Sequence, residues 1–279
     1  MSNLQGPILV FDSGVGGLSV VAHLRAVMPG RSLTFLCDNA ALPYGTKEDT
    51  WLIERIVSVC CAGVRASGAG VLVVACNTAS TLALDALRAA LPIPVVGTVP
   101  AIKPAAAMSR NGVIGLLATS GTVRRRYTDH LIARFAAEQR VVRVAADALV
   151  RQAEQWLAGS PTDPDVIERS LEPLFADAEL DTVVLGCTHF PLLRPFFETL
   201  APRPMQWIDS GAAIARRTVT VAPQGCMITE GADASFATAP AEQGMIHALK
   251  RYEFSAPQGI EPLRSEEIQN ELLNSEQPR

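Results

Sequence analysis

Several features that mark common protein classes are missing from this sequence. Its cysteines form no Cys-x-x-Cys pair and are too sparse for a disulfide scaffold, so we expect free thiols in a reducing cytoplasm. No apolar run is long enough to span a bilayer, and no signal region precedes the first strand pattern, so we expect neither a membrane partner nor export. Lysine and arginine form no basic stripe in a chain of net charge −4, which argues against a nucleic-acid partner.

The composition is that of a protein with a substantial core. The chain has 279 residues, of which 48% are hydrophobic and 19% charged, so it is long enough for two domains and apolar enough to fold them. Short runs rich in valine, isoleucine and leucine alternate with helical patterns along most of the chain. Such alternation is typical of an α/β fold with mostly parallel sheets covered by helices on both faces.

The periodicity predicts where these elements lie. The predicted strands are Ile8–Phe11, Leu33–Cys37, Val71–Cys76, Pro94–Gly97, Val113–Ala118, Val141–Val144, Thr182–Cys187 and Gln206–Ile208. The predicted helices are Leu18–Met28, Glu48–Ala66, Ser80–Leu91, Val123–Glu138, Ala148–Ala158, Asp165–Asp177 and Ala212–Val219, with a last one over "MIHALKRYEF". Residues 222–244 have little periodicity, and we expect a loose surface excursion there.

Three motifs recur in the same order at nearly the same spacing. "VFDSGVGG" resembles "LATSGTVR", Cys76 corresponds to Cys187, and "VVGTVPAI" resembles "WIDSGAAI". This predicts two pseudo-symmetric α/β domains with an active site in the cleft between them. We expect residues 1–97 and 207–279 in the first domain and residues 98–206 in the second. The chain from Trp207 onward would return to the first half as a strand and a helix.

Cys76 and Cys187 each close a predicted strand and are followed at once by polar residues. Ligands bind beyond the carboxyl ends of the strands in open α/β sheets, so the two thiols would face each other across the cleft. Backbone N–H groups at the start of the following segments favour a thiolate or a bound carboxylate. A thiolate on one face of a carbon and a thiol on the other can invert that carbon by general acid–base catalysis, without a cofactor.

Further polar groups suit an amino-acid ligand. Asp12 offers a carboxylate to an ammonium group, and Ser13 offers a hydroxyl. The turn at Pro43-Tyr44-Gly45 has free backbone N–H groups that could hold a second carboxylate. We expect the run Arg124-Arg125-Arg126 to form a solvated face at the start of a helix, where one member could attract an anionic substrate.

Other interpretations of these residues are simpler. Each cysteine could be a packed core residue, and Asp12 could be a structural cap of a strand–helix turn. A zinc site from Cys76, Cys187 and His189 would lack a fourth ligand with motif spacing. The glycines after Ser13 do not form a dinucleotide fingerprint, because that motif would need a glycine at Ser19.

Together, the motifs "DSGVGGLSV", "LPYGTK", "ACNTAS" and "LGCTHFPLL" resemble those of the glutamate racemases, in the cofactor-independent aspartate/glutamate racemase superfamily. The resemblance extends from about Ile8 to Arg217. It implies interconversion of L- and D-glutamate for peptidoglycan synthesis by a cytoplasmic homodimer, with no cofactor and no metal. A racemase for aspartate or another acidic amino acid, and a non-catalytic amino-acid-binding protein of the same fold, remain the alternatives.

The resemblance also implies roles for individual residues. Cys76 would act on D-glutamate and Cys187 on L-glutamate, assisted in proton movement by Asp12, His189 and Glu154. Glu154 corresponds by spacing, but Ala146-Asp147 stands before it where relatives often have Cys-Pro. The implied substrate-binding residues are Asp12, Ser13, Tyr44, Gly45, Asn77, Thr78, Thr119, Thr122, Thr188 and His189. Some relatives have a longer N-terminal extension linked to activation by a wall precursor; with seven residues before the first strand, we do not expect that activation here.

Overall fold

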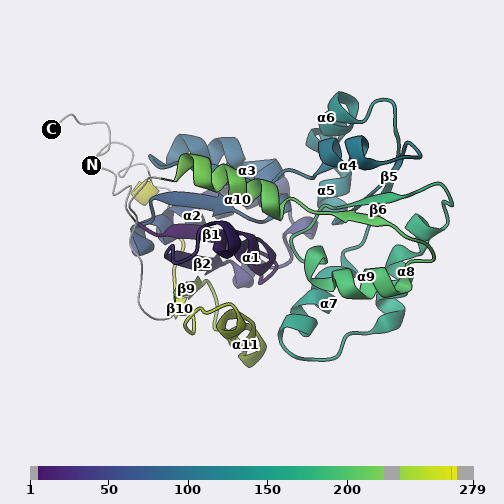
Figure 1. Ribbon diagram of the computed structural model, residues 1–279. Helices are drawn as coiled ribbons and strands as arrows, with labels where there is room; N and C mark the ends of the chain where they lie inside the picture. Colours follow the sequence, from purple (N-terminus) through teal and green to yellow (C-terminus); the bar gives the residue numbers. More distant parts are fainter. Residues whose placement is uncertain (1–5, 223–232, 265, 269–279) are drawn as a thin grey trace.

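The computed structural model describes residues 6–222, 233–264 and 266–268, and these residues form two sheets (Figure 1). The strand order is β10-β9-β2-β1-β3-β4 in the first sheet and β6-β5-β7-β8 in the second, and all neighbouring strands run parallel. The strands are β1 (Ile8–Asp12), β2 (Leu33–Cys37), β3 (Val71–Val74), β4 (Val95–Gly97), β5 (Val113–Ala118), β6 (Arg140–Ala145), β7 (Thr182–Leu185), β8 (Gln206–Ile208), β9 (Ala234–Ala237) and β10 (Gln258–Gly259).

Helices follow most of the strands. The α-helices are α1 (Leu18–Val27), α2 (Asp49–Ser67), α3 (Asn77–Ala90), α4 (Ile102–Met108), α5 (Ser120–Arg124), α6 (Arg126–Phe135), α7 (Ala148–Leu157), α8 (Pro164–Phe175), α9 (Arg194–Leu200), α10 (Gly211–Val221) and α11 (Gln243–Arg251). Short 3₁₀ helices are η1 (Asn39–Ala41), η2 (Tyr44–Thr46) and η3 (Phe190–Leu193). Within the described ranges, no helix is long and apolar enough to cross a bilayer.

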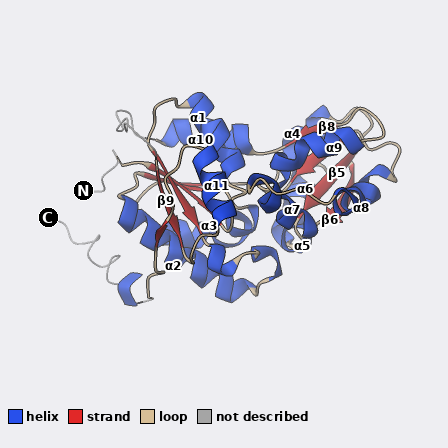
Figure 2. Ribbon diagram, turned by 90° about the horizontal axis from the view of Figure 1, so that it is seen from below, coloured by secondary structure: helices blue, strands red, loops and turns tan. Residues whose placement is uncertain are grey.

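Helices lie around both sheets in Figure 2, and the strands β1, β2, β3, β5 and β7 are buried throughout, whereas the edge strand β6 is partly exposed. In β1, Ile8 and Val10 pack into one apolar cluster, whereas Leu9 and Phe11 pack into another on the opposite face. Successive side chains of a strand point to opposite faces, so a strand covered on both sides must be apolar throughout. This is the physical reason why the strands appear in the sequence as continuous apolar runs.

The two sheets repeat one topology, which confirms the predicted α/β fold with two similar halves. The order β2-β1-β3-β4 in the first sheet corresponds strand by strand to β6-β5-β7-β8 in the second. Cys76 follows β3 and Cys187 follows β7, so the two cysteines lie beyond equivalent strands. The carboxyl ends of the two sheets face each other across the space between the halves.

The expected return of Trp207 to the first half as a strand is wrong. Trp207 pairs with Val183, so β8 is the edge strand of the second sheet. The chain returns to the first half one element later, because α10, unlike β8, packs against α1, β3 and β4. The first repeat does the same, since α4 follows β4 but packs against β5, β7 and α6. We therefore propose domain boundaries at residues 97/98, as expected, and directly after Ile208 rather than before Trp207.

Two further expectations need correction. Ala234–Ala237 forms β9 beside β2, inside the stretch expected to be a loose excursion. Its short alanine and serine side chains carry little hydrophobic signal, and the β2 edge rather than local preference selects the strand. The rest of that stretch, residues 223–232, lies outside the described residues. The helix predicted over Val123–Glu138 is broken at Arg125, whose backbone is extended (φ −75°, ψ 139°) between α5 and α6.

Candidate active site

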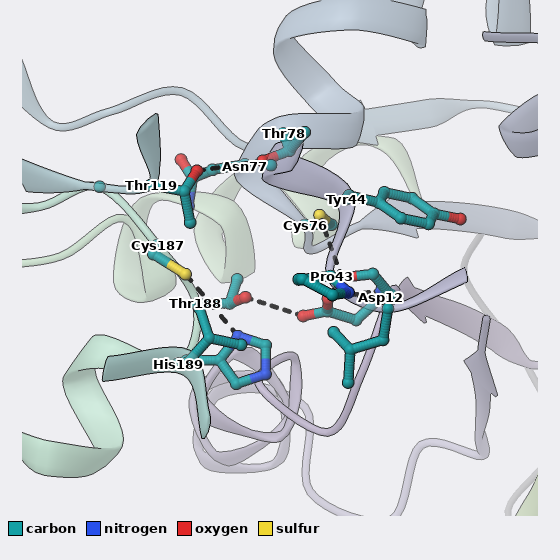
Figure 3. Close-up of a pocket in the computed structure, with 15 residues that line it drawn as sticks. Asp12, Pro43, Tyr44, Cys76, Asn77, Thr78, Thr119, Cys187, Thr188 and His189 are labelled. Atoms are coloured by element: carbon teal, nitrogen blue, oxygen red, sulfur yellow. Dashed lines mark hydrogen bonds between the residues drawn. The ribbon is translucent and has the colours of Figure 1, made fainter. Parts of the chain in front are cut away.

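A cavity between the two halves collects most of the residues predicted from the motifs (Figure 3). Both cysteines line it, and Cys76 and Cys187 are only 6% and 7% exposed. The other predicted residues on its wall are Asp12, Ser13, Tyr44, Gly45, Asn77, Thr78, Thr119, Thr188 and His189. Glu154 and Thr122 lie one contact behind the wall. Pro43, from the turn predicted to hold a carboxylate, also lines the cavity, and the remaining lining residues are Leu42, Val150 and Gly186.

Cys76 is held at the junction of β3 and α3. Ser80 Oγ and Thr98 Oγ1 donate hydrogen bonds to the carbonyl oxygen of Val74 at 2.9 and 2.8 Å, which closes the end of the strand. Cys76 is the N-cap residue of α3, and its Sγ lies 3.7 Å from Ser13 Oγ. Burial, together with the nearby carboxylate of Asp12, raises the pKa of Cys76 far above its usual range. Cys76 is therefore a neutral thiol at neutral pH.

Cys187 has a different set of neighbours. Its Sγ lies 3.7 Å from Nδ1 of His189, and Nε2 of the same ring lies 2.7 Å from Oε1 of Glu154. Burial alone would lower the pKa of His189, but the interactions with Cys187 and Glu154 outweigh it and raise that pKa well above its usual range. The ring is therefore an imidazolium at neutral pH, and this positive charge lies directly beside the sulfur of Cys187.

The glycines of "DSGVGG" allow the first half to approach His189 closely. A Cβ on Gly16 would lie 2.4 Å from Nδ1 of His189, and one on Gly14 would lie 2.3 Å from Oε1 of Glu154. The backbone N–H of Val15 donates to that same carboxylate oxygen at 2.9 Å. The glycine-rich turn is thus needed for packing against the imidazole and its carboxylate, which gives the motif a purpose unrelated to nucleotides.

Asp12 connects the halves at the bottom of the cavity. Its Oδ1 accepts from the backbone N–H of Ser13 at 2.6 Å, and its Oδ2 accepts from Thr188 Oγ1 at 2.8 Å. Burial raises the pKa of Asp12, while the charge of His189 and these donors oppose part of the rise. A buried carboxylate between the two thiols is placed to accept hydrogen bonds from an ammonium group.

The turn at Tyr44 and Gly45 presents its backbone to the cavity. The Tyr44 side chain points away, and its hydroxyl donates to Asp38 Oδ2 at 2.6 Å. Asp38 also accepts from Arg55 at 2.6 and 3.0 Å and is fully buried. Asp38 thus anchors this turn, although it was not among the predicted site residues. Asp38 directly follows β2, just as Asp12 ends β1, and this position at a strand end could have marked it as a candidate site residue.

A row of hydroxyl groups lies at the same end of the cavity as Gly45. Thr78 Oγ1 and Thr119 Oγ1 are 3.4 Å apart across the halves, and Thr119 donates to Thr122 Oγ1 at 3.3 Å. Asn77 is 4% exposed, and no described residue hydrogen-bonds to its Oδ1. A buried polar atom without a partner is costly, so this amide fits a site that a polar ligand completes. Among the described residues, no three His, Cys, Asp or Glu side chains are placed to hold a metal ion.

Comparison with known proteins identifies the family. The family model for Asp/Glu/hydantoin racemases matches residues 18–218. The glutamate racemase of Erwinia tasmaniensis is 48% identical over 217 residues, which are 77% of each chain. That of Escherichia coli K12 is 45% identical over 252 residues, which are 88% of each chain. The chain belongs to the glutamate racemases. It is therefore an enzyme of the racemase class.

Solved glutamate racemases have the same fold. A crystal structure of the E. coli glutamate racemase in complex with L-glutamate and the activator UDP-MurNAc-Ala superposes with a TM-score of 0.87 at 42% identity, covering 93% of this chain and all of that one. The glutamate racemase isoform RacE1 of Bacillus anthracis superposes with a TM-score of 0.77 at 26% identity, covering 94% of this chain and 98% of that one. The α/β fold expected from the sequence is thus confirmed as that of the glutamate racemases.

Proposed function

We propose that this racemase inverts glutamate at Cα by proton transfer between Cys187 and Cys76. The thiolate of Cys187 takes the Cα proton of L-glutamate, so the C–H bond breaks and its electron pair stays on the substrate. The thiol of Cys76 then gives a proton to the opposite face, which forms D-glutamate. The reverse reaction exchanges the roles, and no electrons are gained or lost. The observation that carries the proposal is that two buried cysteines line one cavity and have neighbours of opposite charge.

The remaining residues hold the substrate and return the protons. Asp12 faces the ammonium group of the substrate. Asn77 and Thr188 form the remaining hydrogen bonds to the polar groups attached to Cα. The backbone N–H groups of Tyr44 and Gly45, with the hydroxyls of Thr78 and Thr119, hold the side-chain carboxylate. Ser13 orients the Cys76 thiol, and Thr122 supports Thr119 from behind. His189 and Glu154 form the route by which Cys187 exchanges its proton with solvent.

In the cell, we infer that the enzyme works in the cytoplasm and supplies D-glutamate for peptidoglycan synthesis. This inference rests on membership of the family. The complex of the E. coli relative with L-glutamate supports glutamate as the substrate here too. Activation by UDP-MurNAc-Ala, which that relative also binds, is tested by adding this compound to the assay. The implied homodimer is tested by light scattering during size-exclusion chromatography, where a monomer mass at micromolar concentration would reject it.

The deciding experiment is incubation with L-glutamate in deuterium oxide. Optical rotation and deuterium at Cα are followed together for the native enzyme and for Cys76→Ser and Cys187→Ser. Racemisation with Cα exchange in the native enzyme, and loss of racemisation in both variants, supports the two-thiol mechanism. If the native enzyme racemises aspartate instead, only the substrate is wrong. If neither amino acid exchanges, the chain has kept the fold as a binding protein and the proposal fails.

A further inference from the structure

Arg125 has an unusual position for a residue in a basic run. It separates α5 from α6, and its extended backbone turns the side chain away from the solvated face on which we expected the run to lie. Its side chain is only 11% exposed, and Nη2 lies 2.7 Å from Oδ1 of Asp49. Its neighbours Arg124 and Arg126 are exposed. The middle arginine alone is therefore drawn into an ion pair.

This ion pair connects the two halves of the molecule. Arg125 belongs to the second half, whereas Asp49 is the first residue of α2 in the first half. A direct contact across the cleft resists its opening, and a charged hydrogen bond of this length is stronger than a neutral one. Because the two thiols are almost fully buried, the halves must separate for glutamate to reach them. An ion pair between the halves must then break or lengthen during each cycle.

The pair lies beside one particular end of the cavity. Asp49 follows the Tyr44–Thr46 turn, and Arg125 follows the helix that begins after Thr119. A Cβ placed on Gly121 would lie 2.9 Å from the carbonyl oxygen of Gly45 and 3.0 Å from Nη1 of Arg125. The turn and the guanidinium thus pack on the same glycine, at the end where the hydroxyl groups gather.

The charge of Arg125 is also only partly neutralised. No described residue accepts a hydrogen bond from its buried Nε or Nη1 atoms. Asp49 is 57% exposed, so solvent weakens its share of the attraction. Among the described residues that line the cavity, none is lysine or arginine, although glutamate brings two carboxylates. A guanidinium behind the wall therefore favours an anion at this end of the cavity.

We propose that Arg125 and Asp49 form a clasp that closes the cleft over the side-chain carboxylate of the substrate. The inference rests on the proposed function for the place of that carboxylate. Arg125 is a positioning residue: it does not touch the substrate but holds the Gly45 turn against the Thr119 wall, and its charge stabilises the closed, occupied state. Losing the clasp weakens binding more than it slows proton transfer, because the thiols and their neighbours stay unchanged.

The test is a double-mutant cycle with glutamate kinetics. We expect Arg125→Gln and Asp49→Asn each to raise KM by roughly fivefold, while kcat changes by less than about twofold. The double variant should be no worse than Arg125→Gln alone, because both changes remove the same contact. Arg124→Gln is the matched control, one residue away on the exposed face, and its KM should equal that of the native enzyme.

A swapped version of the clasp separates contact from charge. The double variant Asp49→Arg with Arg125→Asp keeps an ion pair between the halves but moves the positive charge away from the cavity wall. Its KM should therefore lie between that of the native enzyme and that of Arg125→Gln. Strictly additive effects of the two single variants on KM, an equal effect of Arg124→Gln, or a KM of the swapped variant no lower than that of Arg125→Gln would each overturn the clasp. Failure of the proposed function is distinguishable, since the native enzyme itself would then leave glutamate unchanged.

Discussion

The two halves of this racemase have the same topology but give their cysteines opposite surroundings. Beyond β3, Cys76 is the N-cap residue of the long helix α3 and lies beside Ser13 and the carboxylate of Asp12. Beyond β7, Cys187 precedes only the short 3₁₀ helix η3 and lies beside the imidazole of His189. Cys76 therefore lies near a negatively charged carboxylate, and Cys187 lies near a positively charged imidazolium.

This difference teaches what duplication of a fold can and cannot provide. Repetition brings two thiols to equivalent strand ends, and because the two sheets face each other, both thiols line one cavity. A fully symmetric site would hold both sulfur atoms in the same protonation state, with two bases or two acids. Transfer across a carbon needs one of each, so the residues that follow the strands must differ.

The largest expected effect comes from removing each thiol and following both enantiomers. We expect racemisation to fall by at least about 10³-fold in Cys76→Ser and in Cys187→Ser. Cys76→Ser should still exchange the Cα proton of L-glutamate without inversion, because Cys187 remains as its base. Cys187→Ser should do so only with D-glutamate. Proton NMR in deuterium oxide measures both exchanges.

Two outcomes of that experiment would break the comparison. If both variants exchange the same enantiomer, the thiols are not assigned to opposite faces of Cα. If Cys60→Ser, a buried cysteine away from the cavity, loses as much activity, then the effect comes from packing rather than from chemistry.

A smaller effect is expected when the positive side of the site is weakened. Glu154→Gln removes the carboxylate that holds the His189 proton, so the pKa of His189 should fall. We expect kcat to decrease by about 10- to 100-fold, since proton exchange at Cys187 slows while the thiols remain. Circular dichroism of glutamate measures the rate, and Glu172→Gln, an exposed glutamate of α8, is the matched control.

The same variant has a signature in stability. The pKa of His189 is raised in the folded protein, so its charge stabilises the fold fully below the ordinary histidine value of about 6.5. That contribution is lost as the pH rises through the folded-state pKa. The urea midpoint of the native enzyme should therefore fall with rising pH above about 6.5, and this fall should shrink in Glu154→Gln. Parallel curves for the two proteins would contradict the assignment.

The smallest expected effect distinguishes the cavity wall from the layer behind it. Thr119 lines the cavity, whereas Thr122 contacts Thr119 but not the cavity. We expect Thr119→Val to raise KM for glutamate by about tenfold, because a hydrogen bond to a carboxylate is lost. Thr122→Val keeps the shape and should raise KM by less than about threefold. Equal effects in initial-rate assays would mean that Thr122 also binds substrate.

Much of the fold was predictable because its causes are local. Strands such as Leu33–Cys37 and Val113–Ala118 have the predicted bounds, since burial on both faces requires a continuous apolar run. β9 was not predictable, since Ala234–Ala237 is a strand only because the edge of β2 is beside it. The same applies to β8, whose sequence fits an edge of either sheet and whose partner Val183 is chosen by the fold.

The sequence by itself determined the two cysteines at strand ends, the polar residues that follow them and the repeat that makes them equivalent. Those are properties of short segments, and the physics of strands and turns is local. The tertiary structure alone decided that Tyr44 turns its side chain to Asp38, that His189 meets Glu154, and that Arg125 pairs with Asp49. In the last two pairs the partners are far apart in the chain, and their interaction energy exists only after the sheets have folded and faced each other.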